Sequence, residues 1–249
     1  MQVTKYNASG NDFVIFHTFL RQPRNELAKK LCDRHTGVGA DGLIVLVPHH
    51  GYDFEWEFYN SDGSDAEMCG NGSRAAAHYA YTNALAGEKM KFLTLAGVIE
   101  ATIEGDEAEV KLTEPKILDE VIVEEGMRWK LFDTGVPHLV TFVDDLKLFD
   151  KEKARKMREK YNANVNFAKI ESEKKSIHVR TYERGVEDET QACGTGMAAA
   201  FYAAFLEGRV EAETKVYPTS RAELTLRLHE NSIYFKGRVE KIFETSVSL

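Results

Sequence analysis

One sequence pattern occurs twice in this chain, and this repeat constrains the fold more than any other feature. Residues 65–76 read DAEMCGNGSRAA, and residues 189–200 read ETQACGTGMAAA. Each copy has an acidic residue, then Cys-Gly-x-Gly, then small residues typical of a buried helix. The copies lie about half a chain length apart. We therefore expect a duplicated fold in which each half places one cysteine at a helix N-terminus.

Short strands separated by turns dominate the predicted secondary structure. Residues 54–58 read Phe-Glu-Trp-Glu-Phe, an alternation that predicts a half-buried strand. Because strands and helices do not alternate regularly, the pattern favours an α+β fold over a doubly wound parallel sheet. Further strands are predicted at 43–47, 90–95, 98–103, 108–112, 138–143, 164–170, 177–182, 209–217, 222–228 and 233–243. Helices are predicted at 24–35 (closed by Gly37), at 150–161, and in the Ala-rich stretches after Gly72 and Gly196.

The repeat also predicts how the chain is divided. We expect an N-terminal half at 1–114 that carries Cys69 and is completed by 238–249. The C-terminal half at 115–237 would carry Cys193. If two such halves pack about a pseudo-twofold axis, their cysteines face each other across a cleft.

Composition narrows the class of protein. The 249 residues include 40 acidic and 32 basic ones, a net charge of −8 that argues against nucleic-acid binding. The longest apolar run, Met197–Leu206, is too short to span a membrane. The first residues lack the pattern of a secretory signal, and three cysteines suit a reducing compartment. We expect a soluble cytoplasmic protein.

The Cys-Gly-x-Gly segments have a specific chemistry at a helix start. Helix N-termini present unpartnered N–H groups and a partial positive charge, and glycine lets a ligand approach the backbone. Gly70-Asn71 and Gly194-Thr195 are therefore predicted to form anion cradles with a thiol at the edge of each. A thiol so placed has a lowered pKa, so Cys69 or Cys193 can rest as a thiolate.

Two such thiols suit the inversion of a carbon that bears a hydrogen. That reaction needs a base on one face of the carbon and an acid on the other. When the carbon lies next to a carboxylate, the N–H groups of both cradles can stabilise the charge that develops as the proton leaves. We therefore predict that Cys69 and Cys193 form a two-sided acid–base pair.

The sequence gives less support to other roles for its cysteines and histidines. A lone cysteine is more often a small buried hydrophobic residue, and Cys32 on the apolar face of helix 24–35 is predicted to be one. We predict no metal site, because no C-x₂-C or H-E-x-x-H motif occurs, and His49-His50 is predicted to lie in a solvated turn. No nucleotide-binding motif occurs either, whereas pyridoxal phosphate leaves no reliable signature and stays open on this reasoning.

Nine motifs lie along nearly the whole chain. They are Ala8-Ser9-Gly10-Asn11-Asp12-Phe13, Asp33-Arg34-His35, Gly37 to Gly42, Asn60 to Ser64, Met68 to Gly72, Pro137-His138, Asn164 to Phe167, Glu183-Arg184-Gly185 and Ala192 to Gly196. In this order, these motifs resemble those of the diaminopimelate epimerase family.

This resemblance implies a cofactor-independent epimerase that interconverts LL- and meso-2,6-diaminopimelate in lysine and peptidoglycan precursor synthesis. It implies a homodimer whose subunit has two similar halves, each a mixed sheet wrapped around a central helix. It assigns the acid–base pair to Cys69 and Cys193, and pKa tuning of the thiols to His138 and Glu183. The substrate-binding residues that it implies, together with the cradle residues, are Asn11, Asn60, Gly70, Asn71, Asn164, Glu183, Arg184, Gly194 and Thr195.

Three departures from the family pattern concern substrate recognition. Val136 stands where many members have Asn, Gly42 stands where some have Gln, and the loop from Glu183 to Cys193 is one residue longer than usual. These changes predict a looser fit at the distal end of the substrate. The alternatives are a racemase of another amino acid such as glutamate, lysine or a proline derivative, a thiol–disulfide or redox-sensing protein, and a non-catalytic anion-binding module.

Overall fold

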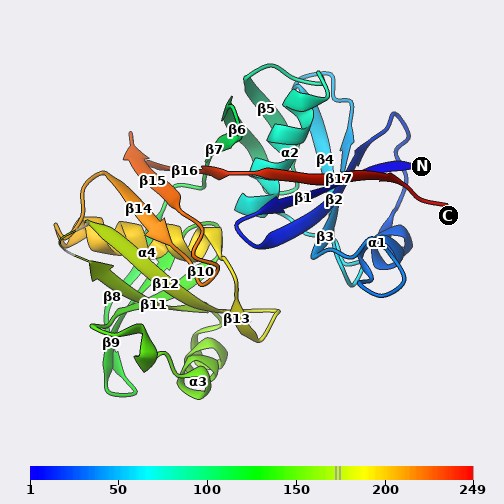
Figure 1. Cartoon of the computed structure of the whole chain (residues 1–249). Coiled ribbons are helices and arrows are strands. Elements are labelled where there is room, and N and C mark those ends of the chain that lie inside the picture. The colour runs from blue at the N-terminus through cyan, green and yellow to red at the C-terminus, as the bar shows by residue number, and fades with distance from the viewer. Residues whose placement is uncertain (172, 174, 249) are drawn as a thin grey trace. The chain divides into compact units, whose positions relative to one another are not determined.

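One order of strands and helices occurs twice along this computed structural model, which describes residues 1–171, 173 and 175–248 (Figure 1). The chain forms two compact units, Met1–Val110 with Gly237–Leu249 (unit 1) and Lys111–Lys236 (unit 2). The first elements are β1 (Gln2–Ala8), β2 (Asn11–His17), α1 (Asn25–Cys32), β3 (Gly42–Val47), β4 (Phe54–Asn60), α2 (Gly70–Thr82), β5 (Lys89–Thr94), β6 (Gly97–Glu104) and β7 (Glu107–Lys111). Then follow β8 (Lys116–Glu124), β9 (Met127–Asp133), β10 (Pro137–Phe142), a 3-10 turn η1 (Leu146–Leu148), α3 (Lys151–Tyr161), β11 (Asn164–Glu171), β12 (Ser176–Glu183), β13 (Asp188–Thr190), α4 (Gly194–Leu206), β14 (Glu213–Tyr217), β15 (Leu224–His229), β16 (Ser232–Arg238) and β17 (Glu240–Ser246).

The pairing of strands repeats together with their order. In unit 1, α1 connects the parallel pair β2–β3, β3 and β4 are antiparallel, and α2 connects the parallel pair β4–β5. In unit 2, α3 connects the parallel pair β10–β11, β11 and β12 are antiparallel, and α4 lies between the parallel strands β12 and β14. The predicted α+β fold of two similar halves with mixed sheets is confirmed.

Each sheet curves around a helix rich in small residues. In unit 1, α2 contacts β1, β2, β3 and β6, and in unit 2, α4 contacts five strands from β9 to β14. Almost every residue of α2 as far as Ala80 is buried, and α4 is buried to a similar extent. Alanine and glycine make this possible, because a helix enclosed on most sides leaves little room for large side chains.

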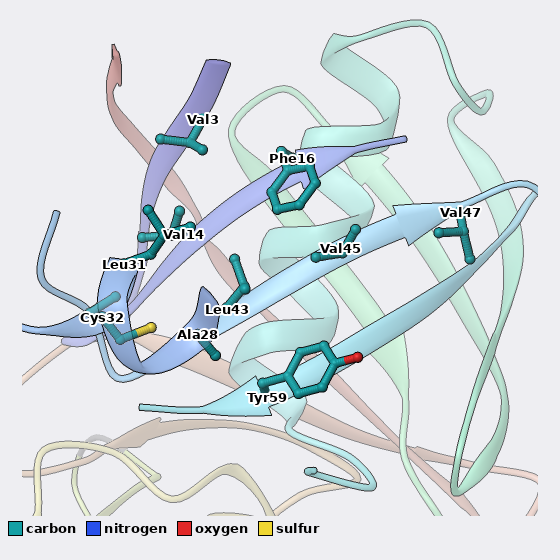
Figure 2. Packing of buried hydrophobic residues seen from close by; sticks show 11 residues of the cluster. Val3, Val14, Phe16, Ala28, Leu31, Cys32, Leu43, Val45, Val47 and Tyr59 are labelled. Carbon is teal, nitrogen blue, oxygen red and sulfur yellow. The ribbon is translucent and has the colours of Figure 1, made fainter. Parts of the chain in front are cut away.

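The other face of the unit 1 sheet is covered by α1. Val14, Phe16, Leu43 and Val45 point from the sheet toward this helix, and Cys32 joins their cluster from the helix side (Figure 2). Strand β3 is buried on both faces, which explains its unbroken apolar sequence. The outer helix and the central helix thus enclose the sheet between two apolar layers.

Three helix boundaries differ from their predictions. The helix predicted at 24–35 ends at Cys32, because the Asp33 carboxylate accepts hydrogen bonds from the N–H groups of residues 35 and 36 and forms a turn. The two Ala-rich helices begin at Gly70 and Gly194, three residues earlier than predicted. The Cys-Gly-x-Gly segments therefore form the first helical turns, and the cysteines are the N-cap residues.

Several strand predictions were incomplete. The strand predicted at 54–58 is confirmed, with Phe54 and Trp56 buried in β4. The strand predicted at 209–217 begins only at Glu213, because residues 207–212 follow the turn that ends α4. The prediction of a single strand at 233–243 is wrong. Two strands, β16 and β17, occupy this region, and β17 pairs with β1. Strands β1, β2, β8, β9 and β13 were not predicted.

The two central helices end in the same way. After α2, the N–H groups of Ala84 and Leu85 donate to the carbonyls of residues 81 and 80, and after α4 those of Gly208 and Arg209 donate to residues 205 and 204. This is the Schellman motif, whose first residue after the cap takes a left-handed conformation. Its φ is 55° at Ala84 and 67° at Gly208. Both residues are exposed, so alanine and glycine differ at these positions mainly in how well they tolerate the left-handed backbone conformation.

This matched pair predicts opposite stability changes. Ala84→Gly should raise the free energy of unfolding by about 0.5–1 kcal/mol, because the left-handed conformation costs alanine about 1–2 kcal/mol and glycine's greater freedom in the unfolded chain offsets part of this gain. Gly208→Ala should lower that free energy by a similar amount. Denaturant unfolding measures both, and changes of equal sign would contradict this account of the helix ends.

Candidate functional site

The Cys69 thiol caps the N-terminus of the central helix in unit 1. Its Sγ accepts a hydrogen bond from the N–H of Gly72 at 3.4 Å, the role that Ser or Asp commonly plays at an N-cap. The Oδ1 of Asn11 lies 3.5 Å from the same sulfur. The thiol is thus held at the helix start between a backbone donor and an amide oxygen.

Asn11 is held in one orientation by a carboxylate. Its Nδ2 donates to Oδ2 of Asp41 at 2.6 Å, and Arg34 forms an ion pair with Asp41 at 2.8 Å. Since Asp41 fixes which end of the amide is the nitrogen, Oδ1 faces Cys69 and also lies 3.5 Å from Nδ2 of Asn71. The amides of Asn11 and Asn71 therefore meet beside the sulfur.

A buried arginine that the sequence did not reveal as a site residue lies beneath this group. Arg74 is fully buried in α2, and its Nη2 donates to Oδ1 of Asn71 at 2.8 Å and to Oγ of Ser9 at 3.0 Å. Burial lowers the pKa of Arg74 to about 10, while the charge of Cys69 acts in the opposite direction. The guanidinium therefore stays charged at neutral pH. The position that corresponds to Arg74 in the second repeat is Ala198.

Asn60 and Gly42 are two further positions of unit 1 that the sequence connects with substrate recognition. Asn60 ends β4, and its Nδ2 donates to Oγ of Ser64 at 3.0 Å in the following turn. Gly42 pairs with Asn60 across the sheet. A Cβ at Gly42 would lie 2.6 Å from the ring of Phe58, so no side chain fits there in this chain. The absence of a polar residue at position 42 therefore reflects close packing.

The second thiol lies at the start of α4 in unit 2. Cys193 is buried at the N-cap, and its Sγ is 3.6 Å from Oγ1 of Thr195. That hydroxyl is 2.9 Å from Nε2 of His138 in β10. His138 therefore reaches the sulfur through Thr195, the variable residue of Cys-Gly-Thr-Gly.

His138 is a neutral side chain in this environment. It is completely buried, and burial, with a smaller contribution from the charge of Arg184, lowers its pKa to about 3. His138 therefore influences the Cys193 thiol through its hydrogen bond to Thr195 and not through a positive charge.

The other predicted residues of unit 2 form a group at the ends of β11 and β12. Asn164 accepts the backbone N–H of Arg184 through Oδ1 at 2.8 Å. The Arg184 guanidinium donates to the carbonyl of Asn162 at 2.9 Å, and Glu183 accepts from Oγ1 of Thr190 at 2.7 Å. Asn164 thus joins the segment of Arg184 to the strand that neighbours His138.

The third cysteine has a different environment. Cys32 is 2% exposed within the apolar cluster beneath α1, and burial raises its pKa to about 12. Its predicted structural role agrees with this placement. His49 and His50 stack in the turn after β3. Within residues 1–171, 173 and 175–248, no group of three or more His, Cys, Asp or Glu residues is arranged to hold a metal ion. No helix in the same described residues is long and apolar enough to cross a membrane.

Known proteins share both the sequence and the fold. The chain matches the family model for diaminopimelate epimerase over residues 3–118 and 131–242. A diaminopimelate epimerase of a Nitratiruptor species is 64% identical over 245 residues, covering 98% of both proteins. That of Helicobacter pylori is 44% identical over 257 residues, covering 96% of this chain and 93% of the relative.

Among solved structures, a probable proline racemase from Agrobacterium radiobacter superposes with a TM-score of 0.76. The match covers 100% of this chain and 93% of that one, at 15% sequence identity. A hydroxyproline epimerase from Agrobacterium vitis gives a TM-score of 0.71, covering 98% of this chain and 91% of that one, at 14% identity. At these identities the likeness concerns the fold.

The neutral state of His138 predicts a pH dependence of stability. Its folded pKa of about 3 lies below the ordinary value of 6.5, so between these pH values the unfolded chain binds the additional proton. The stabilisation is complete above pH 6.5 and is lost as the pH falls toward 3. His138→Gln should therefore reduce the fall in unfolding free energy between pH 6 and pH 4 by about 1.4 kcal/mol per pH unit.

Denaturant unfolding at several pH values measures this slope. His50→Gln, a change of an exposed histidine, serves as the control for removing an imidazole. Equal slopes for the parent and His138→Gln would show that His138 is not buried as a neutral group.

Proposed function

This chain belongs to the diaminopimelate epimerase family, and on that premise we propose that Cys69 and Cys193 are its acid–base pair and need no cofactor. The chain is an isomerase, and the proposed reaction interconverts LL- and meso-2,6-diaminopimelate at one α-carbon. The observation that carries the proposal is the repeated placement of a cysteine. In each half, a cysteine occupies the N-cap position of the central helix and Gly-x-Gly forms the first helical turn.

The proposed mechanism transfers one proton on each face of the α-carbon. A thiolate removes the α-proton and becomes a thiol, and the electron pair left on carbon delocalises into the adjacent carboxylate. The opposite thiol then donates its proton to the other face and becomes the thiolate. The configuration is inverted, one proton has been taken up and one released, and the two sulfurs have exchanged protonation states.

The first helical turns would stabilise the charge that develops on the carboxylate. Their N–H groups have no intrahelical acceptors, and the helix dipole favours negative charge at this end. In a site closed to water, such preorganised donors contribute more than they do in solvent. Gly70-Asn71 and Gly194-Thr195 are the residues proposed for this role.

We assign recognition of the distal end of the substrate to polar side chains around the two thiols. The Arg184 guanidinium suits the second carboxylate, because its planar fork binds both oxygens. We further propose that Glu183 and His138 adjust the pKa values of the thiols. The remaining residues proposed to contact substrate are Asn11, Asn60, Asn164 and Glu183.

The protein is further proposed to be a cytoplasmic homodimer that acts in lysine and peptidoglycan precursor synthesis. Each half, 1–114 with 238–249 and 115–237, would contribute one thiol. Light scattering after size-exclusion chromatography measures the mass, and a mass of one chain would contradict the dimer.

A second candidate function is racemisation of another amino acid. The fold shared with a probable proline racemase and a hydroxyproline epimerase supports it, as does Val136, which offers no polar side chain. A panel of amino acids distinguishes the two. Turnover of proline, glutamate or lysine without turnover of diaminopimelate would favour the second function.

The proposed mechanism predicts which variants exchange the substrate's α-proton. In D₂O, the parent should incorporate deuterium into LL-diaminopimelate during conversion to the meso form. Cys69→Ala and Cys193→Ala should each reduce this rate by at least about 10²-fold, the lower range for loss of general acid–base catalysis. Mass spectrometry measures the deuterium content of the substrate and product.

Cys32→Ala is the matched control. It removes a third thiol from the apolar cluster beneath α1 and should leave the exchange rate close to that of the parent at a temperature where it is folded. Circular dichroism verifies that all three variants fold. Undiminished exchange in both the Cys69 and Cys193 variants would exclude the two-thiol mechanism.

A further inference from the structure

Asn166 is a buried side chain whose amide can adopt only one orientation. It lies in β11 and is 0% exposed. Its Nδ2 donates to the carbonyl of Leu139 at 2.9 Å, and its Oδ1 accepts from Oγ1 of Thr181 at 2.8 Å. Because a carbonyl oxygen can only accept, the atom beside Leu139 must be the nitrogen.

This orientation determines the tautomer of His138. The same Nδ2 of Asn166 lies 3.2 Å from Nδ1 of the imidazole. Since Nδ2 is a donor, Nδ1 must be an acceptor and carries no proton. A neutral imidazole has one ring proton, which is then on Nε2. Complete burial, which lowers the pKa of His138 to about 3, keeps the ring in this neutral form.

The tautomer in turn orients the hydroxyl of Thr195. Nε2 of His138 lies 2.9 Å from Oγ1 of Thr195. Nδ2 of Asn164 is farther from Nε2, at 3.5 Å, and has the carbonyl of Pro137 as its acceptor at 3.4 Å. The protonated Nε2 donates to the hydroxyl oxygen, so the hydroxyl proton is available to another acceptor. Sγ of Cys193 lies 3.6 Å from that oxygen. A hydroxyl that donates to sulfur stabilises the thiolate over the thiol.

We propose that Asn166 is a positioning residue that holds His138 in the Nε2–H tautomer and thereby makes Thr195 a hydrogen-bond donor to the Cys193 thiolate. This inference rests on the proposed function insofar as Cys193 is an acid–base group. The hydrogen bonds themselves do not depend on it.

The packing of Gly196 supports a specific role for Asn166 beside the helix start. A Cβ at Gly196 would lie 2.3 Å from Oδ1 of Asn166 and 3.1 Å from Oγ1 of Thr181. At the corresponding Gly72, the nearest atom would be the methyl group of Ile44 at 3.3 Å. The absence of a side chain at Gly196 therefore leaves room for the Asn166 amide, whereas Gly72 packs against an apolar side chain.

The tautomer can be measured directly in the unmodified protein. With ¹⁵N-labelled histidine, nitrogen shifts distinguish a protonated ring nitrogen from an unprotonated one, and the spectrum of His138→Gln identifies the His138 signals. We expect a protonated Nε2 and an unprotonated Nδ1 at neutral pH. A protonated Nδ1 would overturn the proposal without any further variant.

Two substitutions test the connection to the sulfur. Asn166→Asp keeps the size of the side chain but presents only acceptors, so it draws the imidazole proton to Nδ1. Nε2 then accepts the Thr195 hydroxyl proton, and that hydroxyl no longer donates to Cys193. Thr195→Val removes the same donor with little change of shape. Each should raise the pKa of Cys193 by about one, equivalent to about tenfold less thiolate at a pH well below that pKa.

The measurement is the alkylation rate of the Cys193 peptide as a function of pH, followed by mass spectrometry. In the double variant, Asn166→Asp should add nothing to the effect of Thr195→Val, because its influence passes through the hydroxyl. An equal further rise in the double variant would show that the added carboxylate acts by charge, and the proposal would be wrong.

These readouts separate this inference from the proposed function. Alkylation rates and nitrogen shifts are measured without turnover. They therefore test this inference even if deuterium exchange does not depend on Cys193. If circular dichroism shows that Asn166→Asp does not fold, Thr195→Val and the tautomer of the parent still decide the question. An unchanged Cys193 pKa in Thr195→Val would overturn the proposal.

Discussion

Enclosure of a small-residue helix by a curved sheet is the constraint on which the rest of this structure depends. Helices α2 and α4 are buried almost throughout, so their sequences are restricted to residues such as alanine and glycine. A buried helix still begins with N–H groups that have no intrahelical acceptors. In α2, the sulfur of Cys69 accepts one of them. The packing that stabilises each half therefore also creates a place where a thiol meets oriented backbone donors.

The sequence predicted the features that follow from local patterns. The repeat identified both central helices, and the alternation at residues 54–58 identified β4. Strand β1 was not predicted because its buried positions include Lys5, which is 8% exposed and forms an ion pair with Asp12. A lysine is seldom buried without a partner for its charge. Here the partner lies on the next strand, so the alternation of apolar residues within β1 alone does not reveal it. Strand β8 was not predicted for the opposite reason, since most of its residues are exposed and its pairing with β9 leaves no apolar alternation.

The same limit explains which site residues could be found. Cys69 and Cys193 stand in a repeated motif, so their glycine context distinguishes them from Cys32. Arg74 lies in the first copy of the repeat, but the second copy has Ala198 at the corresponding position, and Asn166 lies outside the repeat. A single arginine in a helix normally reaches solvent. Arg74 is buried because its guanidinium donates to Ser9 and to the carbonyl of Arg238, which are distant in the sequence, as well as to Asn71 in its own helix. The contacts of Asn166 likewise come from neighbouring strands and the start of α4, which a sequence pattern does not specify.

Duplication of the fold has not made the two thiols electrostatically equivalent. In both halves the variable residue of Cys-Gly-x-Gly joins the thiol region to a buried polar side chain. Asn71 accepts from Arg74, a cation that stays charged at neutral pH, whereas Thr195 contacts His138, which burial keeps neutral. A permanent charge acts on a nearby thiol at a distance, but a neutral ring acts only through hydrogen-bond direction. The helix starts supply what the halves have in common, and the residues behind them determine how the thiols differ.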